Sequence, residues 1–265
     1  MMVDFLWPHL QALPYFRATL RAVEARLMQE VTLPPPVLDI GCGDGHFASV
    51  AFHRRVDVGL DPHRPSLRQA AGWGGYRLLV CAAGARIPAA PAAFGSAMSN
   101  SVLEHIPGLD AVLVAVNRAL QSGAPFVFTV PNPGYRTQLS VPRALNRVGL
   151  SPLARGYTDW FMWMSRTKNL FDEHGWREHL AQAGFEIERT FRYFSPRALH
   201  ALEWGHYFGA PCVLARWITG QWILAPHRWN LWLTDRLVRR YYDELPNEQG
   251  TYSFYLARKV RDAAG

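Results

Sequence analysis

Short apolar runs and helical patterns alternate along the first half of the chain. The pattern of a buried strand recurs at residues 37–40, 56–60, 77–81, 96–99 and 125–130. Apolar residues at helical spacing cover residues 109–120, and Gly123 ends that helix. Strands that alternate with helices in this way pair as βαβ units. The sequence therefore predicts a doubly wound α/β fold, to which runs at residues 185–194 and 251–260 add a sixth and a seventh strand.

The N-terminal segment has the pattern of one amphipathic helix. Residues 4–30 carry apolar side chains at helical spacing, from Leu10 to Leu27, and prolines 34–36 end the pattern before the first strand. We expect a helical lid over residues 1–33. Ordinary packing of an amphipathic helix onto the core is the alternative.

Two aromatic segments interrupt the alternation. Residues 134–170 follow the fifth strand and contain no clear strand, so we interpret them as a substrate lid. Its candidate substrate-binding residues are Tyr135, Tyr157, Trp160 and Phe161. Residues 195–247, between the sixth and seventh strands, hold five of the ten tryptophans, interleaved with arginines. Tryptophan joins a large apolar surface to one N–H donor, so this segment predicts a hydrophobic pocket or a membrane interface, with helical packing as the alternative.

A turn with three alternating glycines follows the first strand. Residues 37–45 read VLDIGCGDG, so Gly41, Gly43 and Gly45 follow Asp39. Glycine permits positive φ angles and lets a ligand approach the backbone without meeting a Cβ atom. His46 stands where a dinucleotide fingerprint has its third glycine. The turn therefore predicts a nucleoside ligand and disfavours a nicotinamide oxidoreductase.

An acid follows the second strand, twenty positions after Gly41. Asp61 comes directly after the run at residues 56–60 and precedes Pro62. The carboxyl ends of adjacent parallel strands meet at one crevice. We therefore expect Asp61 to accept hydrogen bonds from the two vicinal hydroxyls of a ribose that lies over the glycine turn.

Two further motifs complete an ordered set. Residues 100–105 read NSVLEH, and residues 123–133 read GAPFVFTVPNP. The chain resembles class I S-adenosylmethionine-dependent methyltransferases, in particular the broad bacterial type-11-like group with N-S-V-L-E-H after strand four. The resemblance covers residues 35–135 well and residues 171–187 more weakly. It implies a seven-stranded Rossmann-like sheet with an antiparallel last strand, in one domain spanning residues 1–265 with its cofactor-binding core at residues 34–133.

The resemblance also implies S-adenosylmethionine as cofactor and S-adenosylhomocysteine as product. The residues that it assigns to cofactor binding are Asp39, Gly41, Cys42, Gly43, Gly45, Asp61, Pro62, Ala83, Gly84, Asn100 and Ser101. Ala83 stands where the family has an acid that binds adenine, so backbone groups or water would replace that acceptor. In the family the N-terminal segment often covers the cofactor, and Tyr15 or Arg17 could reach its methionine carboxylate.

His105 is the candidate catalytic residue. Methyl transfer from a sulfonium mainly requires alignment of the nucleophile, the methyl carbon and the sulfur. An oxygen nucleophile also needs a base, and His105 follows strand four and titrates near neutral pH. A structural or cofactor-contacting role is the alternative.

We expect no metal site. Related enzymes bind a divalent ion through an E-x-x-E-H cluster, but Ser101 replaces its first glutamate here. His174 and His179 are five positions apart, which does not place them on one face of a helix.

Charge and cysteine content add little that is specific. The formal net charge of +7 comes almost entirely from arginine, because Lys168 and Lys259 are the only lysines. That charge fits an anionic partner, such as a phospholipid surface, a phosphorylated glycolipid or RNA, or a solvated face, and the scarcity of lysine argues against a nucleic-acid partner. Three cysteines show no disulfide or metal spacing, and no apolar run could span a bilayer. We expect a cytoplasmic protein. An alternative is that it also binds peripherally to the inner face of the membrane. The sequence does not decide its oligomeric state.

Two functional hypotheses follow. The first is a methyltransferase that acts on an oxygen of a hydrophobic or lipid-linked small molecule. The alternative is a non-catalytic cofactor-binding protein that docks on a membrane or partner through the Trp/Arg-rich segment at residues 195–247.

Overall fold

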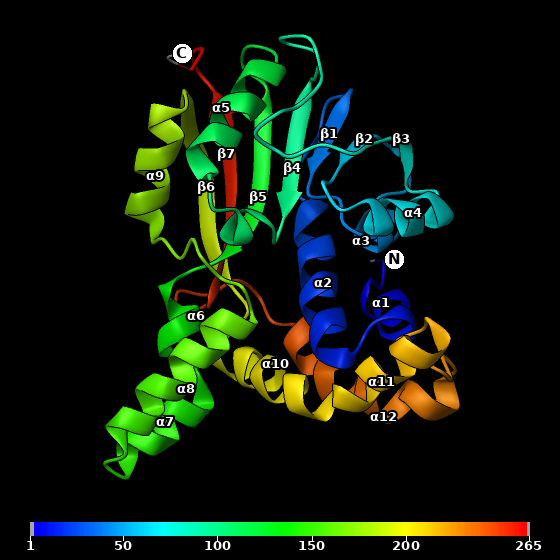
Figure 1. Ribbon diagram of the computed structural model, residues 1–265, viewed down its shortest axis with the longest axis vertical. Helices are drawn as coiled ribbons and strands as arrows, with labels where there is room; N and C mark the ends of the chain where they lie inside the picture. The colour runs from blue at the N-terminus through cyan, green and yellow to red at the C-terminus, as the bar shows by residue number, and fades with distance from the viewer. Residues whose placement is uncertain (1–2, 264–265) are drawn as a thin grey trace. The chain divides into compact units, whose positions relative to one another are not determined.

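Seven strands form one mixed sheet in the computed structural model, which describes residues 3–263 (Figure 1). The strands are β1 (Val37–Ile40), β2 (Val56–Leu60), β3 (Tyr76–Val80), β4 (Ser96–Asn100), β5 (Pro125–Pro131), β6 (Phe185–Tyr193) and β7 (Tyr252–Lys259). Their order is β3-β2-β1-β4-β5-β7-β6, and β7 runs antiparallel to β5. The predicted doubly wound sheet with an antiparallel last strand is confirmed.

The described residues pack as two compact units. Unit 1 comprises residues 3–30, 134–161 and 192–251, and unit 2 comprises residues 31–133, 162–191 and 252–263. Unit 2 therefore contains nearly the whole sheet. Unit 1 gathers the N-terminal segment together with most of both aromatic segments, which the sequence suggested as separate additions to a single domain.

Unit 2 buries its apolar side chains on the central strands. Its helices are α3 (His46–Ala51), α4 (Arg64–Trp73), the 3-10 turn η1 (Leu103–His105), α5 (Leu109–Ala119) and α9 (Glu173–Gln182). The Trp176 ring of α9 lies 4.9 Å from Phe128 of β5, which stacks on Tyr255 of β7. These three buried rings join α9, β5 and β7 into one core.

Unit 1 is helical. Its elements are α1 (Leu6–Ala12), α2 (Tyr15–Met28), α6 (Pro133–Thr137), α7 (Ser140–Arg147), α8 (Ser151–Met164), α10 (Pro196–Phe208), α11 (Ala210–Thr219) and α12 (Arg228–Tyr242), of which α6 and α8 extend slightly into unit 2. The single N-terminal helix expected over residues 4–30 is wrong, because Leu13 has an extended backbone and Pro14 is not helical, so the two residues separate α1 from α2. Proline lacks the N–H that would continue the helix.

A buried carboxylate links two helices of unit 1. Glu203 of α10 is fully buried and accepts hydrogen bonds from Ser140 and Val141 at the start of α7. The carboxylate satisfies backbone N–H groups that a helix start leaves without intrahelical partners.

The strand registers bring the ends of four strands to one edge of the sheet. Ile40 of β1 pairs with Leu60 of β2, Asp39 pairs with Met98 of β4, and Asn100 pairs with Thr129 of β5. The residues that follow these strands therefore lie close together, as the sequence predicted.

Candidate functional site

The glycine turn after β1 has the geometry that its sequence predicts. Gly41, Gly43 and Gly45 have φ angles of +79°, +55° and +78°. The N–H groups of Gly41 and Cys42 both donate to the Leu60 carbonyl, at 2.8 and 3.1 Å. The turn is thus fixed to the end of β2.

The three glycines are needed for different reasons. A Cβ atom on Gly41 would lie 2.3 Å from Val102 Cγ1, and one on Gly45 would lie 2.7 Å from Ala70 Cα. A Cβ atom on Gly43 would meet only the Gly41 carbonyl oxygen, at 4.0 Å. Gly41 and Gly45 therefore permit close packing of the protein, whereas Gly43 leaves an open space above the backbone that a ligand can enter.

Asp61 connects the glycine turn to the segment after β2. Its two carboxylate oxygens accept separate backbone hydrogen bonds, Oδ2 from Gly43 N–H at 3.0 Å and Oδ1 from His63 N–H at 2.8 Å. Each oxygen can accept a further hydrogen bond. The carboxylate is therefore held in one orientation beside Gly43 and can accept from ligand hydroxyls.

Asp39 lies deeper than the sequence indicated and has a protein partner. Its buried carboxylate accepts a hydrogen bond of 2.5 Å from the Tyr76 hydroxyl of β3. Burial and the neighbouring Asp39 raise the pKa of Tyr76 well above its ordinary value, which keeps the hydroxyl a donor. Tyr76 was missed from the sequence, although Gly59 is a signal: a Cβ atom there would lie 2.7 Å from the Tyr76 ring.

Cys42 is unsuited to nucleophilic chemistry. Burial, with the carboxylates of Asp39 and Asp61 nearby, strongly raises the pKa of its thiol. A thiol rather than a thiolate therefore lines the turn at neutral pH.

The segment after β3 contains Ala83 and Gly84, the two residues that the resemblance assigns to adenine binding. Ala83 is exposed, and its carbonyl accepts from Arg86 N–H at 2.8 Å. A Cβ atom on Gly84 would lie 3.2 Å from Val112 and 3.3 Å from Ile40. Pro62 is fixed nearby, because its carbonyl accepts from the Cys81 thiol at 3.6 Å.

Hydrogen bonds to β5 hold the end of β4. Thr129 of β5 donates its hydroxyl proton to Asn100 Oδ1 at 2.9 Å, and this fixes the orientation of the Asn100 amide. Ser101 has a φ of +50°, and its N–H donates to Thr129. Few non-glycine residues adopt the left-handed conformation, and those that do are found disproportionately at functional sites.

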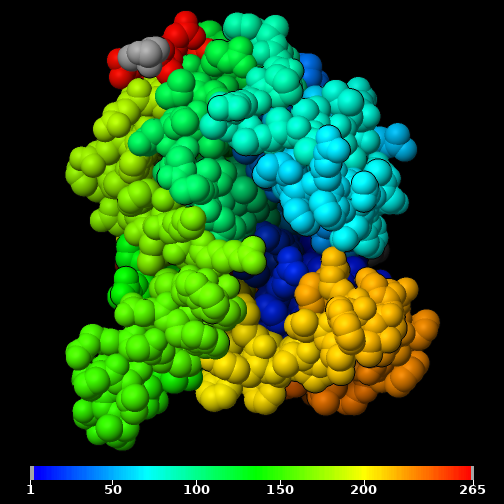
Figure 2. All heavy atoms as spheres, viewed as in Figure 1, coloured from blue at the N-terminus to red at the C-terminus, as the bar shows by residue number. Residues whose placement is uncertain are grey.

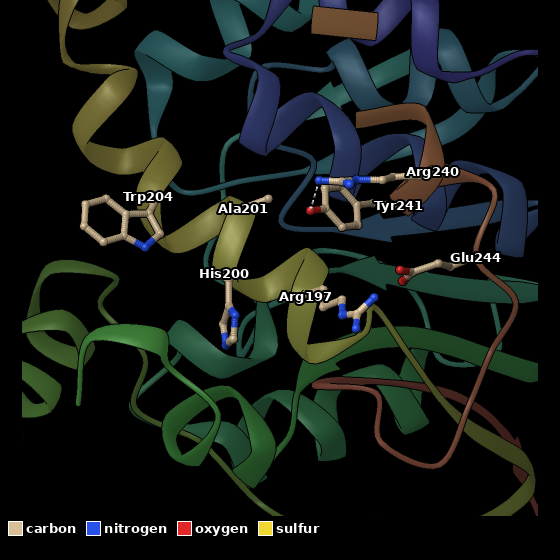
Figure 3. A pocket seen from close by; sticks show the side chains of 7 residues that line it. All are labelled: Arg197, His200, Ala201, Trp204, Arg240, Tyr241 and Glu244. Atoms are coloured by element: carbon tan, nitrogen blue, oxygen red, sulfur yellow. Dashed lines mark hydrogen bonds between the residues drawn. The ribbon is translucent and has the colours of Figure 1, made fainter. Parts of the chain in front are cut away.

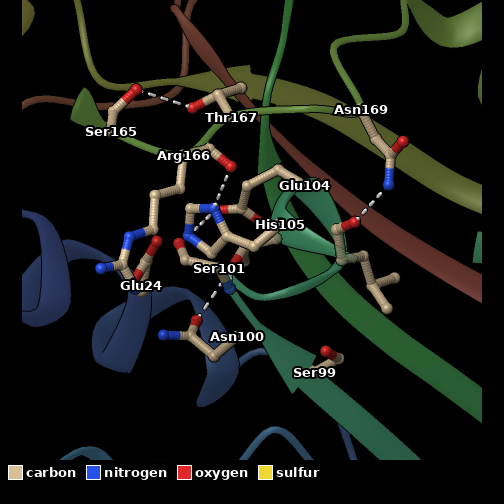
Figure 4. Close-up of polar contacts among 12 residues, drawn as sticks. Glu24, Ser99, Asn100, Ser101, Glu104, His105, Ser165, Arg166, Thr167 and Asn169 are labelled. Atoms are coloured by element: carbon tan, nitrogen blue, oxygen red, sulfur yellow. Dashed lines mark hydrogen bonds and ion pairs between the residues drawn. The ribbon is translucent and has the colours of Figure 1, made fainter. Parts of the chain in front are cut away.

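His105 lies at the end of η1 with an exposed ring (Figure 4). Its Nδ1 is 3.1 Å from the Arg166 carbonyl oxygen, which can only accept, so Nδ1 carries the proton of that hydrogen bond. In the neutral ring the lone pair is then on Nε2, which is 3.7 Å from Glu104 Oε1. A general base needs this tautomer.

The segment before α9 holds η1 in place, an arrangement that no sequence motif predicted. The N–H groups of Lys168 and Asn169 donate to the Glu104 carbonyl at 2.7 and 3.0 Å. The Asn169 amide also donates to the carbonyls of Leu103 and Ile106, both at 2.7 Å. These contacts join residues more than sixty positions apart and position His105 through the backbone.

The four predicted substrate residues lie together in unit 1. The ring of Phe161 is 5.9 Å from that of Tyr135 and 6.2 Å from that of Tyr157, and Trp160 is 5.8 Å from Tyr157. Tyr135 and Phe161 are buried, whereas Trp160 is exposed. Tyr207 of α10, which the sequence did not single out, donates to the Tyr157 hydroxyl at 2.6 Å.

Unit 1 contains an apolar cavity of about 350 Å³ between the α1–α2 corner, α11 and the start of α12. Its walls include Leu13, Ala215, Trp222, Ile223 and Leu231.

A second cavity of unit 1, of about 590 Å³, lies between α10 and α12 and is lined by both charged and aromatic residues (Figure 3). Arg197, His200 and Glu244 line it, and they also border an adjoining cavity of about 1210 Å³ that Arg143 and Arg147 face. The Glu244 carboxylate accepts from the Ser195 hydroxyl at 3.0 Å. Positive side chains therefore predominate along this cleft.

No group of three or more His, Cys, Asp or Glu side chains within residues 3–263 is arranged to hold a metal ion. The two histidines of α9 have separate acidic neighbours. His179 Nδ1 is 2.6 Å from Asp110, and His174 Nε2 is 3.2 Å from Glu178.

Comparison with known proteins identifies the family and the fold. Residues 14–190 match the model of a methyltransferase domain family. A methyltransferase structure from Mesorhizobium loti, S-adenosylmethionine dependent, is 18% identical, with a TM-score of 0.54 over 92% of this chain and 99% of that chain. A possible histamine N-methyltransferase from Thermotoga maritima is 12% identical, with a TM-score of 0.55 over 93% and 89%.

A third similar structure is a geranyl diphosphate methyltransferase in complex with GPP and sinefungin. It is 14% identical, with a TM-score of 0.53 over 89% of this chain and 77% of that chain. At these identities the likeness concerns the fold. The curated proteins give no match.

Proposed function

The chain belongs to the methyltransferase domain family, and from that premise we propose that it methylates an oxygen atom of a hydrophobic or lipid-linked small molecule. The family and the similar structures make it an S-adenosylmethionine-dependent methyltransferase. The observation that carries the finer proposal is that unit 1 contains both an apolar cavity and a separate arginine-lined cleft.

The glycine turn fits the cofactor. The open space above Gly43 and the carboxylate of Asp61 beside it suit a nucleoside whose ribose hydroxyls donate to that carboxylate. When bound, S-adenosylmethionine supplies a methyl group activated by its sulfonium. We assign Asp61 to the ribose, the backbone of Ala83 and Gly84 to the adenine, and Asp39, Asn100 and Ser101 to the methionine side.

His105 serves as the general base in this proposal. Its Nδ1 proton is engaged by the Arg166 carbonyl, so Nε2 can accept the proton of an acceptor hydroxyl. Glu104 Oε1, 3.7 Å away, then faces the imidazolium that forms and stabilises its charge.

The acceptor is inferred from the chemistry of unit 1. A cavity of about 350 Å³ with mainly apolar walls accommodates part of an isoprenoid or acyl group. The cleft suits an anionic group such as a phosphate, because Arg143, Arg147 and Arg197 line it. One guanidinium group can donate two parallel hydrogen bonds to the oxygens of a phosphate. The aromatic cluster of Tyr135, Tyr157, Trp160 and Phe161 adds apolar contact surface. With an amphiphilic acceptor of this kind, we propose that the enzyme acts as a peripheral protein at the inner face of the membrane.

The proposal is tested by transfer of a labelled methyl group. We would incubate the enzyme with methyl-labelled S-adenosylmethionine and bacterial polar-lipid, isoprenoid-phosphate and quinone fractions, and follow the label by mass spectrometry. We expect an acid-stable and base-stable product in which one labelled methyl group replaces a hydroxyl hydrogen of a lipid-soluble compound. In His105→Gln, kcat should fall by about 10²–10⁴-fold while calorimetric binding of S-adenosylhomocysteine stays within about twofold. Equal turnover in that variant would exclude His105 as the general base. Methylation confined to water-soluble amines would exclude a hydrophobic or lipid-linked hydroxyl compound as the acceptor.

A further inference from the structure

Helix α11 exposes an apolar face. Val213, Leu214, Trp217 and Ile218 are 58%, 58%, 82% and 67% exposed, and none of the helix residues is buried. At 100° per residue these four side chains fall within an arc of about 140°. Cys212 and Ala215, on the other side, line the apolar cavity. The helix is therefore amphipathic with its larger apolar side chains turned outward, the reverse of a helix that packs on a core.

Helix α12 has a related outward face. Leu231, Val238 and Tyr242 are its buried residues. The opposite face consists of tryptophan, leucine and arginine, at Trp229, Trp232, Leu233, Arg236, Leu237 and Arg240. The apolar members of this face are each more than half exposed.

The outward faces of α11 and α12 point away from one corner of unit 1. Residues of both helices, among them Ala215 and Leu231, line the same cavity beside Leu13 of the α1–α2 corner. The remaining faces of the two helices are therefore turned away from that corner. In Figure 2 the segment from α11 to α12, coloured yellow to orange, lies at the surface. We call the outward residues of α11 and α12 the Trp/Arg face.

The charges of this segment are mainly positive. Between residues 204 and 242 there are five arginines and a single acid, Asp235. Asp235 is half-buried and paired with Arg239 at 2.7 Å, and Arg239 also contacts Asp4. Arg236 thus remains on the outward face among exposed tryptophan and leucine side chains. Arg240 lies one turn further along α12, at the edge of the cavity that Glu244 also lines, and the exposed Asp243 caps the helix.

We infer that the Trp/Arg face docks the protein on an anionic phospholipid bilayer. Tryptophan favours the headgroup level of a bilayer, leucine and isoleucine enter the acyl boundary, and arginine binds lipid phosphates. An apolar surface without arginine would suit a second protein copy equally well, whereas the positive charge matches a negative leaflet. The described residues contain no helix long and apolar enough to cross a membrane, so the docking is interfacial. The inference is independent of the methyl acceptor, because bilayer binding requires neither acceptor nor cofactor.

The test is cosedimentation of the full chain with phosphatidylcholine vesicles that contain no or 40% phosphatidylglycerol. We expect binding to the anionic vesicles that falls steeply as salt is raised. Trp217→Ser/Ile218→Ser should lower the partition coefficient at least about tenfold, because it removes two exposed apolar side chains. Arg236→Gln/Arg240→Gln should lower it roughly 30-fold on anionic vesicles only, at about fivefold per arginine.

Trp163→Ser is the matched control, because Trp163 of α8 is 76% exposed and lies outside the Trp/Arg face. It should bind vesicles like the unmodified protein, and each variant should keep its affinity for S-adenosylhomocysteine as a check of folding. Three results would overturn the inference: no binding to anionic vesicles, equal loss in Trp163→Ser, or a concentration-dependent dimer abolished by Trp217→Ser/Ile218→Ser without vesicle binding. The last result would assign the face to a second copy of the chain.

Discussion

The open side of the glycine turn can be tested by adding a single methyl group. Gly43 and Gly123 both lie in unit 2 and both have positive φ angles, of +55° and +73°. An added Cβ atom meets no protein atom closer than 4.0 Å at Gly43 and none within 4 Å at Gly123. Alanine therefore introduces the same kind of backbone strain at both positions without a clash in either.

The two variants separate strain from ligand exclusion. A left-handed conformation costs an L-residue about 1–2 kcal/mol, so Gly43→Ala and Gly123→Ala should both lower the melting temperature by roughly 2–8 °C. Only Gly43→Ala places its methyl group where the nucleoside is expected. Overpacking of about 1–3 kcal/mol would weaken binding about 5- to 150-fold.

Calorimetric titration with S-adenosylhomocysteine measures the difference directly, with each variant held at least 15 °C below its measured melting temperature. We expect a dissociation constant within about twofold of the unmodified protein for Gly123→Ala. Unchanged affinity in Gly43→Ala would refute the placement of the ligand above Gly43. Equal weakening in both variants would show that loss of stability, rather than exclusion of the ligand, controls binding.

Four other variants test separate parts of the structure. Asp61→Ala should weaken S-adenosylhomocysteine binding about 10- to 100-fold in the same titration, and unchanged affinity would exclude the ribose role. Asn169→Ala should lower kcat more than it changes that affinity, because it removes two 2.7 Å hydrogen bonds that hold η1, the turn that carries His105. A rise in KM alone, measured by steady-state kinetics, would contradict this. Glu203→Gln should lower the free energy of unfolding by about 1–3 kcal/mol in a thermal melt, since the buried carboxylate accepts from the start of α7, and an unchanged melt would contradict the link. Burial lowers the pKa of His206 below its ordinary 6.5. The unfolded chain therefore binds the proton more readily, and the stability of the fold should decrease as the pH drops below about 6.5. A His206→Phe variant should lose this part of the pH dependence, and an unchanged pH profile of stability would contradict the role of His206.

The sheet could be predicted because its signals are local. Apolar runs of strand length and the glycines at 41, 43 and 45 depend on neighbouring residues only, and these are the features that the structure reproduces. Pro14 was also a local signal, and it would have separated α1 from α2 if proline had been given more weight than apolar spacing.

Partners distant in sequence could not be predicted from one chain. The Tyr76–Asp39 hydrogen bond joins residues 37 positions apart, and the contact between His105 and the Arg166 carbonyl joins residues 61 apart. Neither pair has a motif of its own. The outward face of α11 has the same limit, because helical spacing shows that Trp217 and Ile218 share a face but not whether that face is covered.

The most direct measurement of the central proposal is the phase in which a transferred methyl group is recovered. Purified enzyme would be given deuteromethyl-labelled S-adenosylmethionine and a whole bacterial extract, which is then partitioned between chloroform–methanol and water. We predict that the label appears as an added methyl ether on a lipid in the organic phase and disappears in His105→Gln. Label found only on water-soluble products, or on nitrogen, would contradict O-methylation of a hydrophobic or lipid-linked acceptor.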